Sequence, residues 1–379
     1  MQFGLPEEKR MLRDAVREFM ERECPPRQVT EWEESATFPF DVWRKLAEYG
    51  YLGLPFPEEI GGGGGDFFDQ MLICEQISYG FNSLAHYYSM CTLFGGTFLQ
   101  KFGSPEQRQL TREVIAGRVR FALSMTEPNA GSDVASLTTR AERDGDGWVI
   151  NGAKIFSTGA HMADYIILFA RTDPNAPKHR GISCFLVPAR TPGITPRPLR
   201  TMGGNAVQTC EVAYENVRLP ADALIGELNR GWHMMLSLLD HERILTACQA
   251  VGLAERALDV TIEHARQREQ FGQPIGKFQS IAHLLADAKT EIEAARLLTY
   301  QAACLANSGQ PASMYASMAK LKATEVAKKV CLDGVQIHGG YGYTDEYEIN
   351  RLARESIIGT IFGGSSQIQR NIIAKQMGL

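Results

Sequence analysis

The chain has 379 residues, which at the usual ~100–200 residues per domain allows two or three domains and at least one large buried core. Apolar residues make up 44% and charged residues 22%, so a disordered or fibrous chain is excluded. The 39 Lys and Arg against 44 Asp and Glu leave a net charge of -5, and no basic run supplies the electrostatic footprint of a nucleic-acid-binding protein.

The longest apolar runs, such as Tyr165–Ala170, are far shorter than the roughly 20 residues that cross a bilayer, and Met1–Glu23 is charged rather than signal-like. The sequence therefore predicts a cytoplasmic protein with no membrane contact, unless a targeting segment has been removed. The 8 cysteines stand singly, without a CxxC pair. We interpret them as reduced thiols, mostly packed in the core, rather than as a disulfide framework or a zinc site.

The first third of the chain has the period of amphipathic helices. Apolar residues recur at three- and four-residue steps along Pro6–Glu23, with a proline in the first turn. The same spacing predicts further helices over Phe40–Tyr49, Phe67–Tyr79 and Leu84–Phe102, with a loop over Pro55–Gly65. Residues 1–120 are therefore expected to form an N-terminal helical domain.

Around Phe121 the pattern changes to short runs rich in β-branched and aromatic residues, separated by Gly, Pro and Asp. The predicted strands are Gly147–Ile150, Tyr165–Arg171, Gly181–Pro188 and Thr209–Tyr214. Residues 121–230 are therefore expected to form a β domain.

Beyond Gly231 the helical period returns and continues to the end of the chain, with breaks at Gly and Pro. The predicted helices are Trp232–Gln270, Phe278–Asn307, Ser313–Ile337 and Ile349–Ile361. Residues 231–379 form the third predicted domain, and the expected fold class is an α+β multidomain chain in the order α, β, α.

Three short motifs are excluded by their spacing. Gly61–Gly65 lacks the GKS/T ending of a phosphate-binding loop. The pair His241 and Glu242 begins like a zinc-protease motif, but Leu245 stands where the second histidine is needed, so no metal site is expected. The tripeptide at residues 364–366 is not a G-x-S-x-G nucleophile motif.

Three other segments join glycine with hydroxyl or amide side chains, a composition that lets backbone N–H groups approach an anionic or ring-shaped ligand. They are Ser124–Asp133, Gln336–Tyr343 and Phe362–Arg370. Taken one at a time, each is also compatible with an ordinary domain junction or a helix-terminating turn.

The helix around Glu242 carries a charge on an apolar stripe. Glu242 shares this stripe with Leu238 and Leu239 behind it and Leu245 ahead, so its carboxylate is predicted to point along an apolar face. A carboxylate there is costly unless it is paired or used. From this helix alone, an ion pair with Arg243 or another basic residue is the favoured interpretation.

Taken together and in order, these segments resemble the acyl-CoA dehydrogenase family of flavoproteins over essentially the whole chain. The resemblance rests on Met125–Pro128, Ala130–Asp133, Ile150–Lys154, Arg268–Ile275, Phe278 with Gln279, Gln336 and Ser366–Arg370. It implies an N-terminal α-helical domain, a middle β-barrel or sandwich-like domain and a C-terminal four-helix bundle. It also implies a homotetramer, or a dimer, with FAD at the subunit boundaries.

The resemblance also implies roles for individual residues. By the family's pattern, Met125, Thr126, Phe156 and Thr158 lie against the flavin ring, Phe156 taking a place that is often Trp. Arg268 and Phe271, with Gln336 and Gly340 from a neighbouring subunit, resemble the contacts to the pyrophosphate and adenosine of FAD. Ser365 and Gln367 resemble further FAD contacts, and Ser132 and Arg243 resemble positions that touch the CoA part of the substrate.

The catalytic base is where this chain departs from the common family pattern. Many members carry Tyr-Glu-Gly-Thr in the last motif, with that Glu as base, but this chain has Phe362–Ser365 with Gly363 at the Glu position. A smaller branch, resembling the isovaleryl- and long-chain-type dehydrogenases, places the Glu on the helix after the β domain, at the position of Glu242. This reciprocal pattern favours Glu242 as the base over the ion-pair interpretation, with the backbone N–H of Gly363 expected to polarise the substrate carbonyl.

The function that the resemblance implies is FAD-dependent α,β-dehydrogenation of an acyl-CoA to the trans-2-enoyl-CoA. Glu242 would take the α-proton, flavin N5 would accept the β-hydride, and the electrons would pass to electron-transferring flavoprotein. Two alternatives remain open: a non-dehydrogenating relative such as a desulfinase or an oxidase, and a silent module that binds acyl-CoA or acyl carrier protein.

The acyl group is not determined by the sequence. His86, Tyr87 and Tyr88 are candidates to line its pocket, although aromatic residues in a helical domain more often belong to the core.

Overall fold

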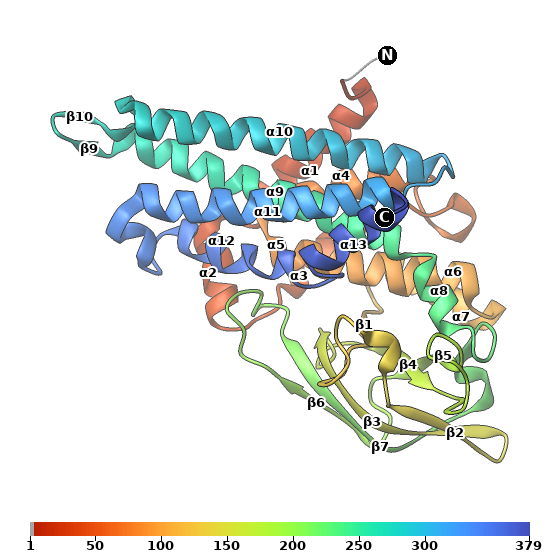
Figure 1. Cartoon of the computed structure of the whole chain (residues 1–379). Helices are drawn as coiled ribbons and strands as arrows, with labels where there is room; N and C mark the ends of the chain where they lie inside the picture. Colours follow the sequence, from red (N-terminus) through yellow and green to blue (C-terminus); the bar gives the residue numbers. More distant parts are fainter. Residues whose placement is uncertain (1–3) are drawn as a thin grey trace. The chain divides into compact units, whose positions relative to one another are not determined.

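The computed structural model describes residues 4–379 (Figure 1). Met1–Phe3 of the predicted N-terminal domain lie outside the described residues. The chain folds as two compact units, which we call the helical unit and the sheet unit. The helical unit comprises residues 4–35, 66–86 and 240–379, and the sheet unit comprises residues 36–65 and 87–239. The first third of the chain is thus divided between the units, and the domain boundaries predicted at residues 120 and 230 remain a prediction.

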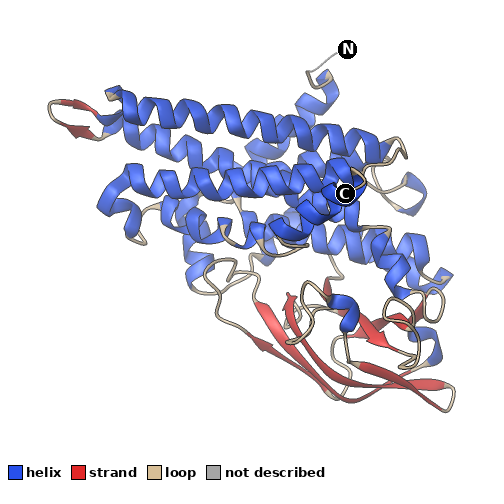
Figure 2. Ribbon diagram, in the orientation of Figure 1, coloured by secondary structure: helices blue, strands red, loops and turns tan. Residues whose placement is uncertain are grey.

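The helical unit consists of helices apart from one short hairpin (Figure 2). In its first two segments lie α1 (Glu7–Glu23), α2 (Pro26–Glu34), α4 (Phe67–Gly80) and the start of α5 (Asn82–Ser89). Its third segment contains α9 (Leu239–Gln267), β9 (Glu269–Gln270), β10 (Gln273–Pro274), η5 (Ile275–Lys277), α10 (Gln279–Asn307), α11 (Ser313–His338), η6 (Gly339–Tyr343), α12 (Glu348–Ser356), η7 (Ile358–Thr360) and α13 (Ser366–Gln376). Helices α10 and α11 pack side by side, and α11 also contacts α12 and α13 (Figure 1).

Local sequence explains several of the helix ends. Helix α4 begins with a capping box, in which the N–H of Asp69 donates to Asp66 Oδ1 at 2.9 Å and the N–H of Asp66 donates to Asp69 Oδ2 at 3.0 Å. Helix α13 is capped by the Ser365 hydroxyl, which accepts from the N–H of Ile368 at 3.4 Å. The cap of α13 fixes Ser365 at the start of that helix.

The helix predicted over Trp232–Gln270 is wrong in two places. Helix α8 (Gly231–Leu236) is separated from α9 by Ser237 and Leu238, and α9 ends at Gln267. After it, Phe271 and Gly272 both have positive φ, +53° and +79°, which is the conformation of a two-residue hairpin turn. This turn pairs β9 with β10 and places the hairpin beyond the ends of α9 and α10 (Figure 1).

The helix predicted over Leu84–Phe102 is not a single α-helix. It begins two residues earlier as α5, continues as a nine-residue π-helix, η2 (Met90–Phe98), and ends as α6 (Leu99–Phe102). Within η2, a Cβ atom on Gly95 would lie 2.3 Å from the Phe121 ring, and one on Gly96 would lie 2.2 Å from the Phe56 ring. These glycines therefore let two aromatic rings pack directly on the widened turn.

The sheet unit contains the predicted β region and helical elements around it. Its helices include α3 (Phe40–Glu48), η1 (Glu58–Ile60), α7 (Pro105–Ile115), η3 (Val134–Ser136) and η4 (Ala221–Ala223). Its strands are β1 (Phe121–Ser124), β2 (Arg140–Asp144), β3 (Gly147–Thr158), β4 (Tyr165–Arg171), β5 (Ile182–Pro188), β6 (Ile194–Pro198), β7 (Thr209–Leu219) and β8 (Leu224–Ile225). The predicted order of α, β and α elements is confirmed.

The strands form one sheet in the order β6-β7-β3-β2-β4-β5-β8, with β1 parallel to β4. Alternating side chains of these strands fill a continuous core that contains Trp148, Phe185 and Tyr214. Strands β3 and β7 run further than predicted, because register shifts after Ile150 and Lys154 let the pairing continue through polar residues.

All eight cysteines are free thiols and all but Cys304 are buried, which agrees with the interpretation of them as reduced thiols mostly packed in the core. Among residues 4–379, no helix has the length and apolar content that a membrane crossing requires.

The contact between α9 and α4 gives a direct stability test. A Cβ atom on Gly252 of α9 would lie 2.2 Å from the carbonyl oxygen of Glu75 in α4, so Gly252→Ala should destabilise the protein by about 1–3 kcal/mol or more. Gly131→Ala is the control, because no atom lies within 4 Å of a Cβ there. Urea unfolding measures both variants, and equal stability would contradict the packing described here.

Candidate active site

Glu242 and Gly363 meet in the helical unit. Glu242 lies in the first turn of α9, and Gly363 lies in the turn before α13, where its φ is +60°. A Cβ atom on residue 363 would lie 3.6 Å from Glu242 Oε1 and 3.8 Å from Thr246 Oγ1. The backbone at Gly363 therefore faces the carboxylate with no side chain between them, and side chains at positions 242 and 363 would compete for one space.

The Glu242 carboxylate has the electrostatic setting of a base. Burial raises its pKa above the ordinary value, and the charges of Arg243 and Lys320 partly oppose this. Arg243 binds Asp240 instead, at 2.9 Å between Nη1 and Oδ1. Within residues 4–379 no ion pair joins Glu242 to Arg243, so the structure does not bear out the pairing considered from the helix alone.

The apolar stripe predicted around Glu242 is largely present. Leu238 and Leu245 are each 1% exposed. Leu238 precedes the first residue of α9, so it flanks the helix rather than belonging to it. Leu239 and Glu242 are partly exposed, so part of the predicted stripe is buried, and this burial raises the pKa of the carboxylate.

Two buried side chains hold the turn that contains Gly363. The ammonium group of Lys320, in α11, donates to the carbonyl oxygens of Phe362 and Gly364, each at 2.8 Å. The amide of Gln369, in α13, donates to the carbonyl oxygens of Gly363 at 3.1 Å and Gly364 at 2.8 Å. Lys320 and Gln369 are fully buried, so hydrogen bonds from two buried side chains fix the position of the turn.

Of the three candidate pocket residues, His86 lies beside this turn. Its ring meets the Phe362 ring edge to face at 5.2 Å between centroids. Burial lowers the pKa of His86 to about 4, although a hydrogen bond with Gln249 opposes the shift, so the imidazole is neutral near pH 7.

Tyr87 and Tyr88 belong to the core of the sheet unit instead. The Tyr87 ring packs on Phe38 and Trp43, and the Tyr88 hydroxyl donates to the carbonyl oxygen of Tyr51 at 3.3 Å. Both tyrosines are 0% exposed. Their place agrees with the core interpretation of aromatic residues in this segment.

In the sheet unit, the segment after β1 is held by a buried ion pair. Lys154 Nζ lies 3.0 Å from Glu127 Oε1 and donates to the carbonyl oxygen of Met125 at 2.9 Å. Burial alone would raise the pKa of Glu127, but Lys154 and hydrogen bonds from Thr139 and Thr138 lower it to about 2. Both charges are therefore present near pH 7, and they fix the backbone at Met125.

The other predicted flavin contacts follow from the same strand pairing. Thr126 accepts a hydrogen bond from the N–H of Ile155 at 2.9 Å. Phe156 occupies the bulge of β3 with φ of +60° and is 62% exposed, an uncommon conformation for an aromatic residue. Thr158 shares a hydrogen bond of 2.9 Å with the hydroxyl of Thr209. The exposed ring of Phe156 is available to pack on a flat ligand.

The predicted pyrophosphate and adenosine contacts lie in the helical unit. Phe271 is at the tip of the β9–β10 hairpin and is 95% exposed. Arg268 begins that hairpin, and its guanidinium carbon lies 5.4 Å from the centroid of the Tyr341 ring. Gln336 and Gly340 are exposed at the end of α11. A large aromatic ring exposed on a hairpin indicates a surface that a ligand or a second chain can cover.

A hollow of about 640 Å³ in the helical unit includes two more predicted contacts, Ser365 and Gln367. Its lining is Glu325, Lys328, Lys329, Leu332, Asp333, Thr360, Ile361, Ser365, Ser366 and Gln367. The Ser366 hydroxyl is buried there and has no hydrogen-bond partner within the described chain. Lys329 is paired with Asp333 at 2.6 Å, so the orphaned hydroxyl, the helix N-terminus and Lys328 are the groups that fit a phosphate-bearing cofactor such as FAD.

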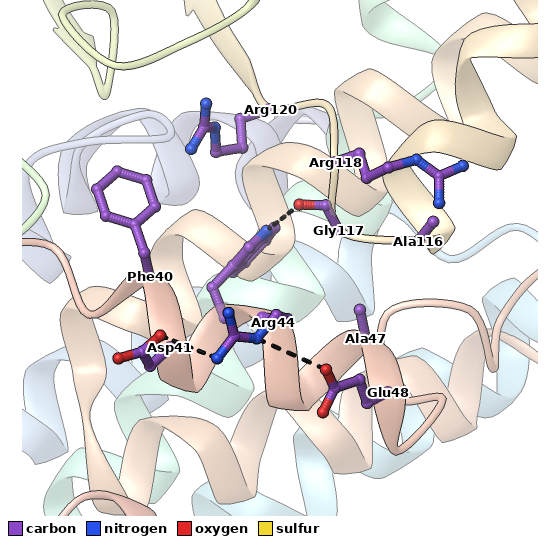
Figure 3. Close-up of a pocket in the computed structure, with 10 residues that line it drawn as sticks. Phe40, Asp41, Arg44, Ala47, Glu48, Ala116, Gly117, Arg118 and Arg120 are labelled. Carbon is purple, nitrogen blue, oxygen red and sulfur yellow. Dashed lines mark hydrogen bonds and ion pairs between the residues drawn. The ribbon is translucent and has the colours of Figure 1, made fainter.

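A second hollow, of about 490 Å³, contains none of the predicted site residues. It lies in the sheet unit between α3 and the segment after α7, and Figure 3 shows Arg44 between Asp41 and Glu48. The other two arginines of its lining, Arg118 and Arg120, also have carboxylate partners, Glu113 and Asp164. Because its cations are paired, we do not assign it a role in the site.

The two predicted CoA contacts lie in different units. Ser132 is exposed in the loop after β1. Arg243 is 9% exposed, and its Nε is buried without a hydrogen-bond partner in the described chain. The unpartnered nitrogen is consistent with a role in binding an anionic group.

Sequence reasoning missed Lys320 and Gln369. A signal for Lys320 was present, because Ala316, Ala323 and Ala327 lie on its side of the predicted helix and make it a cation on an apolar stripe. Gln369 lies inside the Ser366–Arg370 motif, but its role depends on a backbone turn that no residue spacing reveals.

Models of one protein family match almost the whole chain. The acyl-CoA dehydrogenase N-terminal domain matches residues 6–117, the middle domain residues 122–217 and the C-terminal domain residues 229–378. These matches agree with the predicted fold class.

Three similar proteins illustrate the likeness. A Bacillus subtilis protein described as a probable acyl-CoA dehydrogenase, YngJ, is 39% identical and covers 100% of both chains. CarC of Acetobacterium woodii, a subunit of the caffeyl-CoA reductase–Etf complex, is 36% identical and covers 97% of both. The structure of butyryl-CoA dehydrogenase from Megasphaera elsdenii has a TM-score of 0.95 with 34% identity and covers 100% of both chains.

The Lys154–Glu127 pair predicts a large stability effect. Lys154→Met leaves a carboxylate buried without its cation, so the free energy of unfolding should fall by about 3–5 kcal/mol. Lys178→Met is the control, because its pair with Asp133 is exposed and should contribute at most about 1 kcal/mol. Thermal and urea unfolding measure both, and a loss at Lys154 no larger than the control would contradict the assignment.

Proposed function

This chain belongs to the acyl-CoA dehydrogenase family and has that family's activity, the dehydrogenation of an acyl-CoA thioester, and we propose that Glu242 is the base of the reaction. The proposal rests on one observation: residue 363, where many members carry the base, is a glycine whose Cβ position lies 3.6 Å from Glu242 Oε1. A carboxylate on either residue would occupy this space, so Glu242 takes the place that the absent side chain leaves open.

The base must act on a weakly acidic proton. The α-proton of a thioester leaves only if the carbonyl is polarised as negative charge develops on it. The N–H of Gly363 is suited to donate to that oxygen, since within residues 4–379 no hydrogen bond uses it. Burial raises the pKa of Glu242, which makes the carboxylate a stronger base that retains the proton it removes.

We propose FAD as the cofactor. The residues that would hold it are Met125, Thr126, Phe156 and Thr158 of the sheet unit and Arg268, Phe271, Gln336, Gly340, Ser365 and Gln367 of the helical unit. The exposed Phe156 ring and the orphaned Ser366 hydroxyl support this fit. When bound, the flavin supplies the acceptor for the β-hydride.

The substrate contacts and the branch of the family are part of the proposal. Ser132 and Arg243 would bind the CoA portion, and the base would be placed as in the isovaleryl- and long-chain-type dehydrogenases. The similar proteins include a butyryl-CoA dehydrogenase and a caffeyl-CoA reductase subunit, and neither name points to the isovaleryl or long-chain branch, so the acyl group stays open.

We further propose electron-transferring flavoprotein as the electron acceptor. CarC, which is 36% identical to this chain, belongs to a complex with Etf, and this supports the proposal. A homotetramer or a dimer is proposed from the family pattern, and the exposed Phe271 is consistent with an interface. The cytoplasmic location stays a prediction.

Glu242→Gln tests the base. In an anaerobic titration of the holoenzyme with a panel of straight and branched acyl-CoAs, the wild type should lose its visible flavin absorbance. The variant should bleach at least about 10²–10⁴ times more slowly, because the amide cannot accept the proton. Glu263→Gln, on the same helix but exposed, is the matched control and should behave as the wild type.

The outcomes separate the hypotheses. Bleaching that survives in Glu242→Gln at the wild-type rate would refute the base assignment. A wild-type protein that holds FAD but is bleached by no acyl-CoA would favour a non-dehydrogenating relative. A wild-type protein without FAD would favour a silent binding module.

The pH profile supplies an independent prediction. Because only the ionised Glu242 can accept a proton and its pKa is raised, kcat/KM should increase with pH along an acid limb whose midpoint lies above 4.5. Steady-state assays with an artificial electron acceptor measure this limb. The residual activity of Glu242→Gln should lack this acid limb of the kcat/KM profile. A midpoint of the wild-type limb at or below 4.5 would contradict the raised pKa described for the carboxylate.

A further inference from the structure

Lys320 contacts the peptide group that the proposed mechanism uses. We infer that Lys320 is a positioning residue whose buried positive charge strengthens the Gly363 N–H as a hydrogen-bond donor to the thioester oxygen. The inference rests on the proposed function, since it assumes that this N–H binds the substrate carbonyl.

The geometry places the charge on the correct peptide. Lys320 Nζ donates to the carbonyl oxygen of Phe362 at 2.8 Å. That carbonyl and the N–H of Gly363 belong to one planar, conjugated peptide group. A cation at the oxygen end withdraws electron density from the nitrogen end, so the N–H becomes a stronger donor.

The surroundings of Lys320 increase this effect. The side chain is 0% exposed, and a charged hydrogen bond is stronger where water is excluded. The gain is larger in the transition state than in the bound substrate, because negative charge collects on the thioester oxygen as the α-proton leaves. An interaction of this kind increases kcat more than it changes KM.

Structural pairing does not account for the burial of this lysine. In the described part of the chain, no carboxylate lies within ion-pair distance of Lys320, whereas the other fully buried lysine, Lys154, has Glu127 at 3.0 Å. The direct partners of Lys320 are the carbonyl oxygens of Phe362 and Gly364. Burying a cation against neutral carbonyls is costly, and a role in the reaction explains why it is there.

A comparison of Gln369 with Lys320 separates two roles, which are to fix the position of the turn and to bring a positive charge to it. Its neutral amide donates to the carbonyl oxygens of Gly363 and Gly364, so it polarises the two peptide groups after the one that contains the Gly363 N–H. Lys320 and Gln369 therefore share the task of fixing the turn. Only Lys320 brings a charge to the Phe362 carbonyl.

The charged state of Lys320 depends on its neighbours. Burial lowers its pKa to about 8, while the carboxylate of Glu242 raises it and the guanidinium of Arg243 lowers it. Among residues 4–379, these two residues of α9 are the charged groups that shift its pKa, and the turn presents carbonyl oxygens. The lysine is therefore mostly cationic near pH 7 and loses its charge as the pH rises through about 8.

The test measures the substrate carbonyl itself. Holoenzyme is loaded with an acyl-CoA that carries ¹³C at C1 and sulfur in place of the β-carbon, so that it binds but cannot lose a hydride. Infrared difference spectra give the shift of its carbonyl stretch to lower frequency on binding. In the wild type this shift should be large, and it should decrease as the pH increases through about 8.

The variants then assign the cause of the shift. Lys320→Met should lose most of the shift and lower kcat about tenfold or more, with KM within about threefold. Gln369→Met should keep more of the shift than Lys320→Met, and Lys322→Met, a partly exposed lysine of the same helix that pairs with Glu291, should keep all of it. Equal losses in Lys320→Met and Gln369→Met would show that holding the turn is the whole role and would overturn the inference.

The remaining outcomes distinguish this inference from the proposed function. A wild-type carbonyl that does not shift on binding would refute the Gly363 donor itself. A wild-type shift that is retained in Lys320→Met would refute only the role of Lys320. If Lys320→Met does not fold, Lys320→Gln replaces it, because the amide keeps a neutral donor at this position. A carbonyl shift in Lys320→Gln as large as in the wild type would overturn the role of the charge. The pH titration of the wild type needs no variant. A carbonyl shift that stays the same on both sides of pH 8 would also overturn the role of the charge.

Discussion

The close approach between the Glu242 carboxylate and the backbone of residue 363 is the constraint on which the candidate site depends. The turn needs a residue that adopts positive φ at position 363, and glycine does so without strain and leaves the space beside the carboxylate open. Lys320 and Gln369 then hold the carbonyl oxygens of the turn, and within residues 4–379 no hydrogen bond uses the N–H of Gly363. The result is a base and a hydrogen-bond donor fixed side by side before any substrate is present.

Both units use a buried lysine to fix a backbone segment. Lys154 donates to the carbonyl oxygen of Met125, and Lys320 donates to those of Phe362 and Gly364. The two lysines differ in how their buried charge is balanced. Lys154 has Glu127 as its counter-ion, whereas among residues 4–379 Lys320 has no carboxylate in direct contact. A buried ion pair is a structural device, whereas a buried cation bound to carbonyl groups keeps its field directed at the site.

The fold could be predicted where the pattern is local and strong. The helices α1, α4, α10 and α11 begin and end within about two residues of their predicted bounds, because their apolar period is long and their ends carry caps, Pro or Gly. The hairpin after Gln267 and the π-helix at Met90–Phe98 were missed. Positive φ at Phe271, and the packing of Phe121 and Phe56 on Gly95 and Gly96, depend on contacts that helical periodicity does not encode.

For the site, the sequence by itself determined the family resemblance, the absence of a side chain at residue 363 and the presence of a carboxylate at Glu242, since motifs and substitutions are properties of residue order. The tertiary structure alone decided that these two positions share one space, that Arg243 pairs with Asp240 and that Lys320 reaches the Phe362 carbonyl. Residues 242, 320 and 363 are far apart along the chain. Which of their atoms meet is set by the packing of helices and by a turn with two positive-φ glycines, Gly363 and Gly364, and neither is visible in spacing or composition.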